Sequence, residues 1–313
     1  MSAEHVIAFA ERPRSPADHV YLLVDDLADC EEENPLSVAS LTQSLGEASV
    51  ARVLRPDLSH TPSACPALVQ LSAPGEAPPR RYLERSARYA MDDAAYNKRY
   101  VCGWLLSPQP LEAIATHIAT QCHTTAALDG QTSPWFEPLR LELLAAALGG
   151  QLGSILNPVH AWLCPTSWGS YTLLRGARGA LATELPPLAR ETQQLALVVN
   201  DFLGVWRHAL ELPMGFAPWR WTGTSVLPPQ VGTHAFRLVR DARRLGLSNS
   251  HDIIALSLHR VFIHPHLPQH PDIQHAIAQA AAGAFSLQEH FATYSDGTWK
   301  RIAADLPRAE NYT

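Results

Sequence analysis

Trp135-Phe136-Glu137-Pro138-Leu139-Arg140 is the stretch of this 313-residue chain that says most about its fold. The aromatic pair Trp135 and Phe136 is apolar enough to end a strand. Pro138 disfavours the α region at Glu137 and fits the first position of a helix, so a turn follows the aromatic pair. Residues 139–148 then continue as a helix. The stretch therefore predicts a strand, a turn and a helix in succession.

The chain around this junction also alternates between strand and helix patterns. Residues 100–107 predict a strand, and residues 109–122 predict a helix in which His117 is a packed or capping side chain. Asn34-Pro35 predicts another helix start, because Asn suits the N-cap and Pro the first helical position. Further strands are expected at 19–26, near Val53, and at 67–72, 161–164 and 170–175, with a charged helix over 80–98.

Four stretches belong together when taken in order: Tyr21-Leu22-Leu23-Val24-Asp25-Asp26, Cys65-Pro66-Ala67-Leu68-Val69-Gln70-Leu71, Gly103-Trp104-Leu105-Leu106-Ser107 with its following helix, and Trp135-Phe136-Glu137-Pro138. In this order they resemble the adaptor/chaperone family of the bacterial type VI secretion system. They are similar to the family's aspartate-ended first strand, its proline-led second strand, its third strand with a leucine/histidine helix, and its aromatic-Asp-Pro-Arg turn. In the last stretch Glu137 occupies the position of the family's Asp. Leu139 occupies the position of the family's Arg, and Arg140 follows one residue later.

The resemblance covers roughly residues 19–148, and the remainder is similar only in its helix pattern and in Trp299. Members of this family load toxic effectors onto the secretion spike. The resemblance therefore implies a non-enzymatic protein that holds one cognate effector in the cytoplasm and docks it on the spike protein. Its implied partners are that effector and the spike protein.

The composition is that of a soluble globular protein. A net charge of −6 gives no support to a nucleic-acid partner. The five cysteines are scattered without a CxxC pair, which indicates reduced thiols in the cytosol. The N-terminus has no secretory signal pattern, and the most apolar segment, residues 139–156, is too short and too interrupted to span a bilayer. We therefore expect a cytoplasmic protein without stable membrane insertion.

The pattern changes near residues 176–187, which are rich in glycine and proline. The chain before this point predicts an α/β lobe with a short-stranded sheet, and the chain after it predicts an all-helical lobe. In that second part, Gly246 is placed as a helix C′ residue, and Ser286 to Glu289 has the spacing of a capping box. The expected fold class is α+β, with domains at 1–180 and 181–313.

The sequence contains no G-x-S-x-G, H-E-x-x-H, G-x-G-x-x-G or P-loop motif. We expect no catalytic, cofactor-binding or metal-binding residues. Asp25 and Asp26 are interpreted as acids that solvate the start of a loop. The alternative function is a metal-dependent hydrolase that uses the histidines between His259 and His275, because His264 and His266 have the H-x-H spacing of zinc ligands. A third possibility is a catalytically dead remnant that serves as a scaffold.

Two features suit partner binding. Trp219 and Trp221 flank an arginine in a proline-rich loop, and Trp with Arg is enriched in interface hot spots. These tryptophans could equally pin the loop to its own lobe. Three arginines recur on one face of a helix at i, i+3 and i+7, either as a solvated stripe or as a surface for acids. The candidate partner-binding residues are Trp135, Phe136, Glu137, Arg140, Trp219, Trp221, Arg237, Arg240 and Arg244.

Overall fold

The computed structural model describes residues 2–12, 15–28, 30–95, 98–126, 132–179, 184–211 and 226–307. It confirms the α+β class. The chain divides into two compact units, 1–194 and 195–313, and the division falls inside one helix, α7 (Pro187–Glu211). The predicted boundary at 176–187 stays a prediction, and residues 180–183 lie outside the described part.

Unit 1 is built on one six-stranded sheet in the order β2-β3-β1-β4-β5-β6. Every neighbouring pair is antiparallel. The strands are β1 (His19–Val24), β2 (Val50–Arg52), β3 (Ala67–Ser72), β4 (Val101–Ser107), β5 (Ala161–Pro165) and β6 (Tyr171–Arg175). Six of the expected strands are therefore present, each within a few residues of its predicted position.

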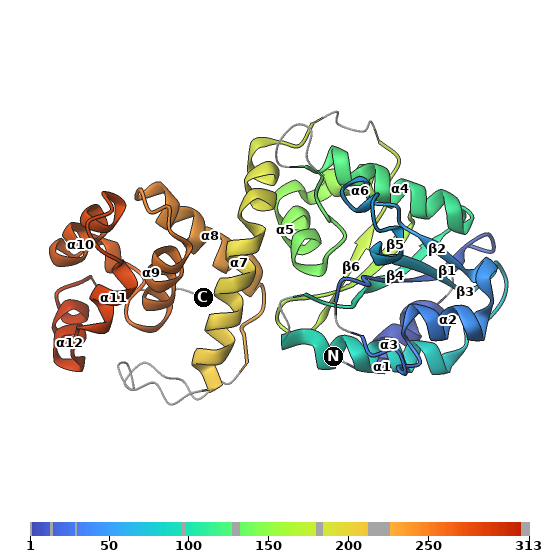
Figure 1. Cartoon of the computed structure of the whole chain (residues 1–313), viewed down its shortest axis with the longest axis horizontal. Helices are drawn as coiled ribbons and strands as arrows, with labels where there is room; N and C mark the ends of the chain where they lie inside the picture. Colours follow the sequence, from blue (N-terminus) through green and yellow to red (C-terminus); the bar gives the residue numbers. More distant parts are fainter. Residues whose placement is uncertain are drawn as a thin grey trace. The chain divides into compact units, whose positions relative to one another are not determined.

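Helices cover both faces of this sheet (Figure 1). One face carries α1 (Ala3–Glu11), α2 (Val38–Leu45) and α3 (Arg80–Asp92), and the other carries α4 (Leu111–Thr124), α5 (Pro138–Leu148) and α6 (Leu152–Leu156). Side chains alternate between the two faces along a strand, so Val20, Leu22 and Val24 enter one core while Tyr21 and Leu23 enter the other. Two hydrophobic cores result, one on each side of the sheet.

Two local predictions are wrong. Trp135 does not end a strand, because its segment bonds to helix α4 and to itself: Ser133 N donates to Cys122 O, and Trp135 N donates to Ser133 O. The second error concerns α2, which begins at Val38 and not at Asn34-Pro35. Asn34 Oδ1 instead accepts a hydrogen bond from Leu36 N at 2.9 Å, and Ser37 caps the helix.

Gly103 in β4 is a position that only glycine suits. Its φ is +144°, and a Cβ there would lie 2.7 Å from Leu163 O and against the Trp162 indole. The Trp162 Nε1 donates to Cys102 O at 3.3 Å, so the indole crosses the strand directly over the glycine. The sheet therefore admits Trp162 into the core only because residue 103 has no side chain.

Within the described residues, one helical stretch, 138–156, is long and apolar enough to cross a membrane. Half of it is buried inside the structure, and it packs in the core on one face of the sheet. A 3₁₀ turn at Gly149–Gln151 separates α5 from α6 within it. The stretch therefore lies in the hydrophobic core on that face of the sheet.

Unit 2 is helical in its described part. Beyond α7 it contains α8 (Val231–Arg244), α9 (Ser250–Phe262), α10 (Pro271–Ala281), α11 (Leu287–Ala292) and α12 (Asp296–Ala304). The expected punctuation is present: Gly246 has φ +97° after α8, and Ser286 Oγ accepts a hydrogen bond from Glu289 N at the start of α11. Trp299 is buried in this unit.

Candidate functional site

A chain of four charged side chains joins the first and last of the motif stretches. Asp25 directly follows β1 and is wholly buried, and its Oδ2 lies 2.9 Å from Lys98 Nζ in an ion pair. Lys98 Nζ also contacts Glu137 Oε1 at 2.6 Å, and Glu137 Oε2 accepts from Arg140 Nε at 3.0 Å. We call these four residues the Lys98 network.

Backbone structure positions each member of the network. Asp25 N donates to Tyr100 O at 2.8 Å, which brings the end of β1 beside the residues that enter β4. Glu137 is the N-cap residue of α5, with Pro138 at the first helical position as the sequence predicts. Arg140 lies in the first turn of that helix. The strand end, the approach to β4 and the start of α5 therefore converge on one lysine.

Arg140 extends the network toward the start of α7. Its Nη1 donates to Gln193 O at 3.0 Å, and the Gln193 amide donates back to Arg140 O at 3.2 Å. Only 11 % of the arginine side chain is exposed. Arg140 therefore forms an ion pair with the acid of the turn and hydrogen bonds with Gln193.

The pKa of Lys98 is raised. Burial alone would lower it, but the nearby Glu137 and Asp25 carboxylates outweigh that effect. The lysine is consequently protonated at neutral pH, and a protonated amine is neither a nucleophile nor a base. Two carboxylates and two cations balance one another, so the ion pairs tie the end of β1, the approach to β4 and the start of α5 together.

Trp135 and Phe136, predicted as partner-binding residues, are core residues in the structure. Both are completely buried. The Trp135 indole donates to Ile118 O at 3.1 Å and packs edge-on against Trp162 at 5.5 Å between ring centroids. Neither side chain offers surface to a partner. Glu137 and Arg140 are partly exposed, but they are engaged in the Lys98 network.

The predicted arginine face lies on α8. Arg237 and Arg244 are exposed, while Arg240 is partly buried with its guanidinium 5.4 Å from the centroid of the Phe236 ring. The i, i+3, i+7 spacing thus falls on a helix as expected. Trp219 and Trp221 lie outside the described residues.

Three of the histidines between His259 and His275 form hydrogen bonds with nearby backbone atoms. His264 Nδ1 accepts from His266 N, and His270 Nδ1 accepts from Asp272 N at the start of α10, each at 3.2 Å. His259 Nδ1 donates to Ala255 O at 2.7 Å. In the described ranges no group of three or more His, Cys, Asp or Glu side chains could hold a metal ion. The hydrolase alternative gains no support from this geometry.

Sequence reasoning missed Lys98 and misread Asp25. The expectation that Asp25 solvates a loop is wrong, because the side chain has no exposure and pairs with a lysine 73 residues away in the chain. Asp26 is partly exposed and pairs with Arg52 at 2.8 Å. One signal was present: Lys98 is one of only two lysines, and it lies three residues before β4.

Comparisons of the chain with known protein families, with characterised proteins and with solved structures found no match.

Proposed function

We propose that this protein is a type VI secretion adaptor/chaperone. In this proposal it binds a cognate effector in the cytoplasm, covers effector surface that would otherwise aggregate, and passes the effector to the spike protein. The protein has no catalytic activity of its own. Its partners are the effector and the spike protein.

One observation carries the proposal: the four stretches that resemble the family belong to one unit, and the outermost two are joined through a single side chain. Residues 21–26, 65–71 and 103–107 contribute β1, β3 and β4. Asp25 from the first stretch and Glu137 from the last meet on Lys98. The convergence of the first and last stretches on one lysine supports the proposal.

Co-expression tests the proposal. The chain is produced with the effector and the spike protein encoded beside it, and the soluble yield of effector is measured with and without the chain. We expect a stoichiometric complex of chain and effector, a higher soluble yield, and displacement of the chain when the spike protein is added. An effector that is equally soluble, and equally loaded on the spike protein, without the chain would refute the proposal.

The same assay tests the predicted partner face. Trp219→Ala should weaken binding of the effector or spike protein by roughly 2 kcal/mol or more, the scale of an interface hot spot. Charge reversal at Arg240 should weaken binding further at low salt, because screening reduces the contribution of exposed charges. A Trp219→Ala variant with lowered melting temperature and unchanged affinity would instead assign that tryptophan to a core.

A further inference from the structure

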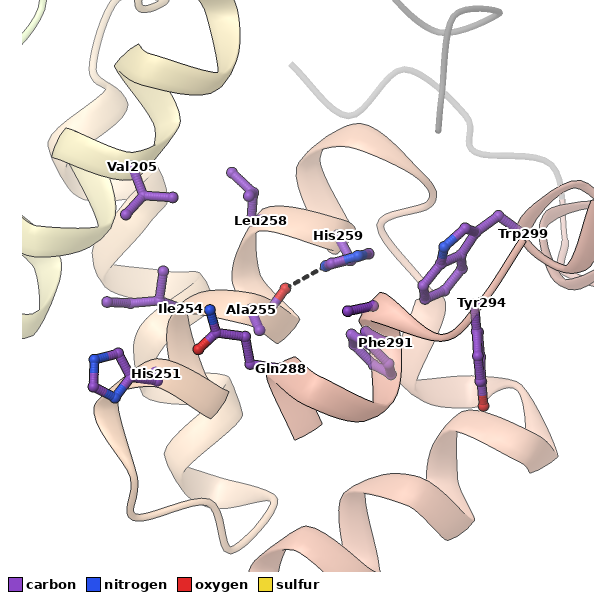
Figure 2. Close-up of a pocket in the computed structure, with 11 residues that line it drawn as sticks. Val205, His251, Ile254, Ala255, Leu258, His259, Gln288, Phe291, Tyr294 and Trp299 are labelled. Atoms are coloured by element: carbon purple, nitrogen blue, oxygen red, sulfur yellow. Dashed lines mark hydrogen bonds between the residues drawn. The ribbon is translucent and has the colours of Figure 1, made fainter. Parts of the chain in front are cut away.

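Unit 2 contains a pocket of about 400 Å³ between α7, α9, α11 and α12 (Figure 2). Its lining residues are Val205, His251, Ile254, Ala255, Leu258, His259, Gln288, Phe291, Ala292, Tyr294 and Trp299. The α9 members recur at i, i+3, i+4, i+7 and i+8, so one continuous face of that helix borders the space. This volume lies within the range that is typical of ligand-binding pockets in proteins.

The buried side of the pocket is aromatic. The His259 ring lies 4.8 Å from the rings of both Phe291 and Trp299, and Phe291 and Trp299 meet edge-on at 5.2 Å between centroids. Phe291 and Trp299 are almost fully buried. These closely packed rings form a wall and leave no gap between them for a ligand. A ligand would therefore lie against the wall, on the side of Val205 and Ile254 (Figure 2).

This wall is uncharged. Burial lowers the pKa of His259 to about 4, and its Nδ1–H is committed to Ala255 O, so the imidazole is neutral at physiological pH. Among the described residues that line the pocket, none is Asp, Glu, Lys or Arg. A charged ligand would lose its hydration without gaining a counter-ion, whereas an uncharged apolar group loses nothing by entering.

The rim of the pocket is accessible. Val205 is 40 % exposed, and His251, Gln288 and Ala292 are exposed as well. An apolar floor with exposed residues around it is the arrangement in which interface anchors are found. The residues that line the pocket include no charged group that would fix a phosphate or a carboxylate, which favours an uncharged apolar group as its occupant.

We propose that this pocket receives one uncharged apolar side chain, aliphatic or aromatic, from the effector. The inference rests on the proposed function and adds to it the place on unit 2 where the effector is held and the chemistry of the group that is held. This site is distinct from the arginine face of α8.

A neutral fluorescent probe, N-phenyl-1-naphthylamine, tests the pocket in the full-length chain. Val205→Asp places a carboxylate at the mouth, and Ala292→Trp fills the rim. Leu197→Asp is the matched control, because Leu197 is also an exposed apolar residue of α7 but does not line the pocket. We expect one probe site, weakened at least about tenfold in both pocket variants and unchanged in the control. Melting curves of all variants verify that they are folded.

The second arm adds the effector encoded beside the chain. Effector should displace the probe, and Val205→Asp should bind effector at least about tenfold more weakly than Leu197→Asp does. Absent probe binding, or equal probe binding by the pocket variants, overturns the inference. Full effector affinity in Val205→Asp overturns the inference and leaves the proposed function standing. A concentration-dependent dimer dissociated by Val205→Asp would assign the pocket to a second copy. No effector complex with the unaltered chain overturns both proposals.

Discussion

Replacing Lys98 with methionine should destabilise unit 1 by about 3 kcal/mol. Methionine keeps the length of the side chain and removes only the charge. Asp25, which has no exposed surface, then keeps one hydrogen bond, from Leu27 N to its Oδ1 at 3.1 Å, and loses its ionic partner. The loss of unfolding free energy measures the cost of a buried carboxylate without a cation beside it, and not the net strength of the ion pair.

The magnitude follows from burial. Removing one partner of a buried pair costs about 3–5 kcal/mol. The lower end applies here, because 33 % of the Lys98 side chain is exposed and water can reach the vacated place. Glu137 adds little to the penalty, since it is partly exposed and keeps Arg140. A loss of about 3 kcal/mol is a large share of the 5–15 kcal/mol that a domain has in total.

Urea unfolding followed by tryptophan fluorescence measures the effect, because Trp104, Trp135 and Trp162 are buried in unit 1. At a slope of about 3 kcal/mol/M the midpoint should fall by about 1 M. Adding Asp25→Asn to Lys98→Met should recover at least about 1 kcal/mol, because a neutral amide costs less to bury than a carboxylate.

Lys300→Met is the matched control, since Lys300 is the other lysine of the chain and is exposed. Its effect should stay within about 0.5 kcal/mol. The reasoning is refuted if Lys98→Met behaves like Lys300→Met, or if the double variant is less stable than Lys98→Met alone. Either result would mean that the buried carboxylate does not depend on the lysine.

Three further predictions concern stability. Gly103→Ala should lower the free energy of unfolding by about 2–4 kcal/mol, because the backbone there has a positive φ and a Cβ would overlap Leu163 O. Gly150→Ala is the control, since a Cβ at residue 150 meets open space, and it should lower the melting temperature little. Equal shifts in melting temperature for the two variants would contradict this prediction. Burial raises the pKa of Asp93 from 3.8 to about 6, so the folded state binds the proton more tightly, and the free energy of unfolding should decrease by on the order of 2–3 kcal/mol as pH rises from about 4 to 6. Asp93→Asn should remove that slope in urea titrations, and an unchanged slope would assign it to other groups. Ser286→Ala should lower the free energy of unfolding in urea by about 1–2 kcal/mol, because Ser286 caps α11 and donates to the buried Asp252 at 2.9 Å. Ser286→Thr keeps the hydroxyl and should retain most of the stability. Equal losses in the two variants would exclude the cap as the cause.

The elements that sequence predicted well carry their signals locally. β3 falls at 67–72 as expected, the end of α8 follows from Gly246, and the start of α11 follows from Ser286. The Trp135 segment shows where local reasoning fails: a short apolar run fits a strand and a packed turn equally, and contacts with α4 decide between them.

The Lys98 network illustrates what spacing alone does not encode. Asp25, Lys98 and Glu137 each have an ordinary local interpretation as solvated charges. They meet only because β1 and β4 are neighbours in the sheet and α5 begins beside them. Strand order was not predicted, so the partner of the buried aspartate was not predictable either. The histidines likewise look like ligands in sequence, while hydrogen bonds to the backbone account for His264 and His270.

The central place of β1 has a consequence for synthesis on the ribosome. The strand emerges first, yet its neighbour β4 follows roughly 80 residues later, which at 5–20 residues per second is a wait of about 4–16 s. During that time at least one edge of β1, an apolar strand, has no partner, and an open apolar edge is a template for aggregation. While it is being translated, the nascent chain should therefore itself be a client of the ribosome-associated chaperones.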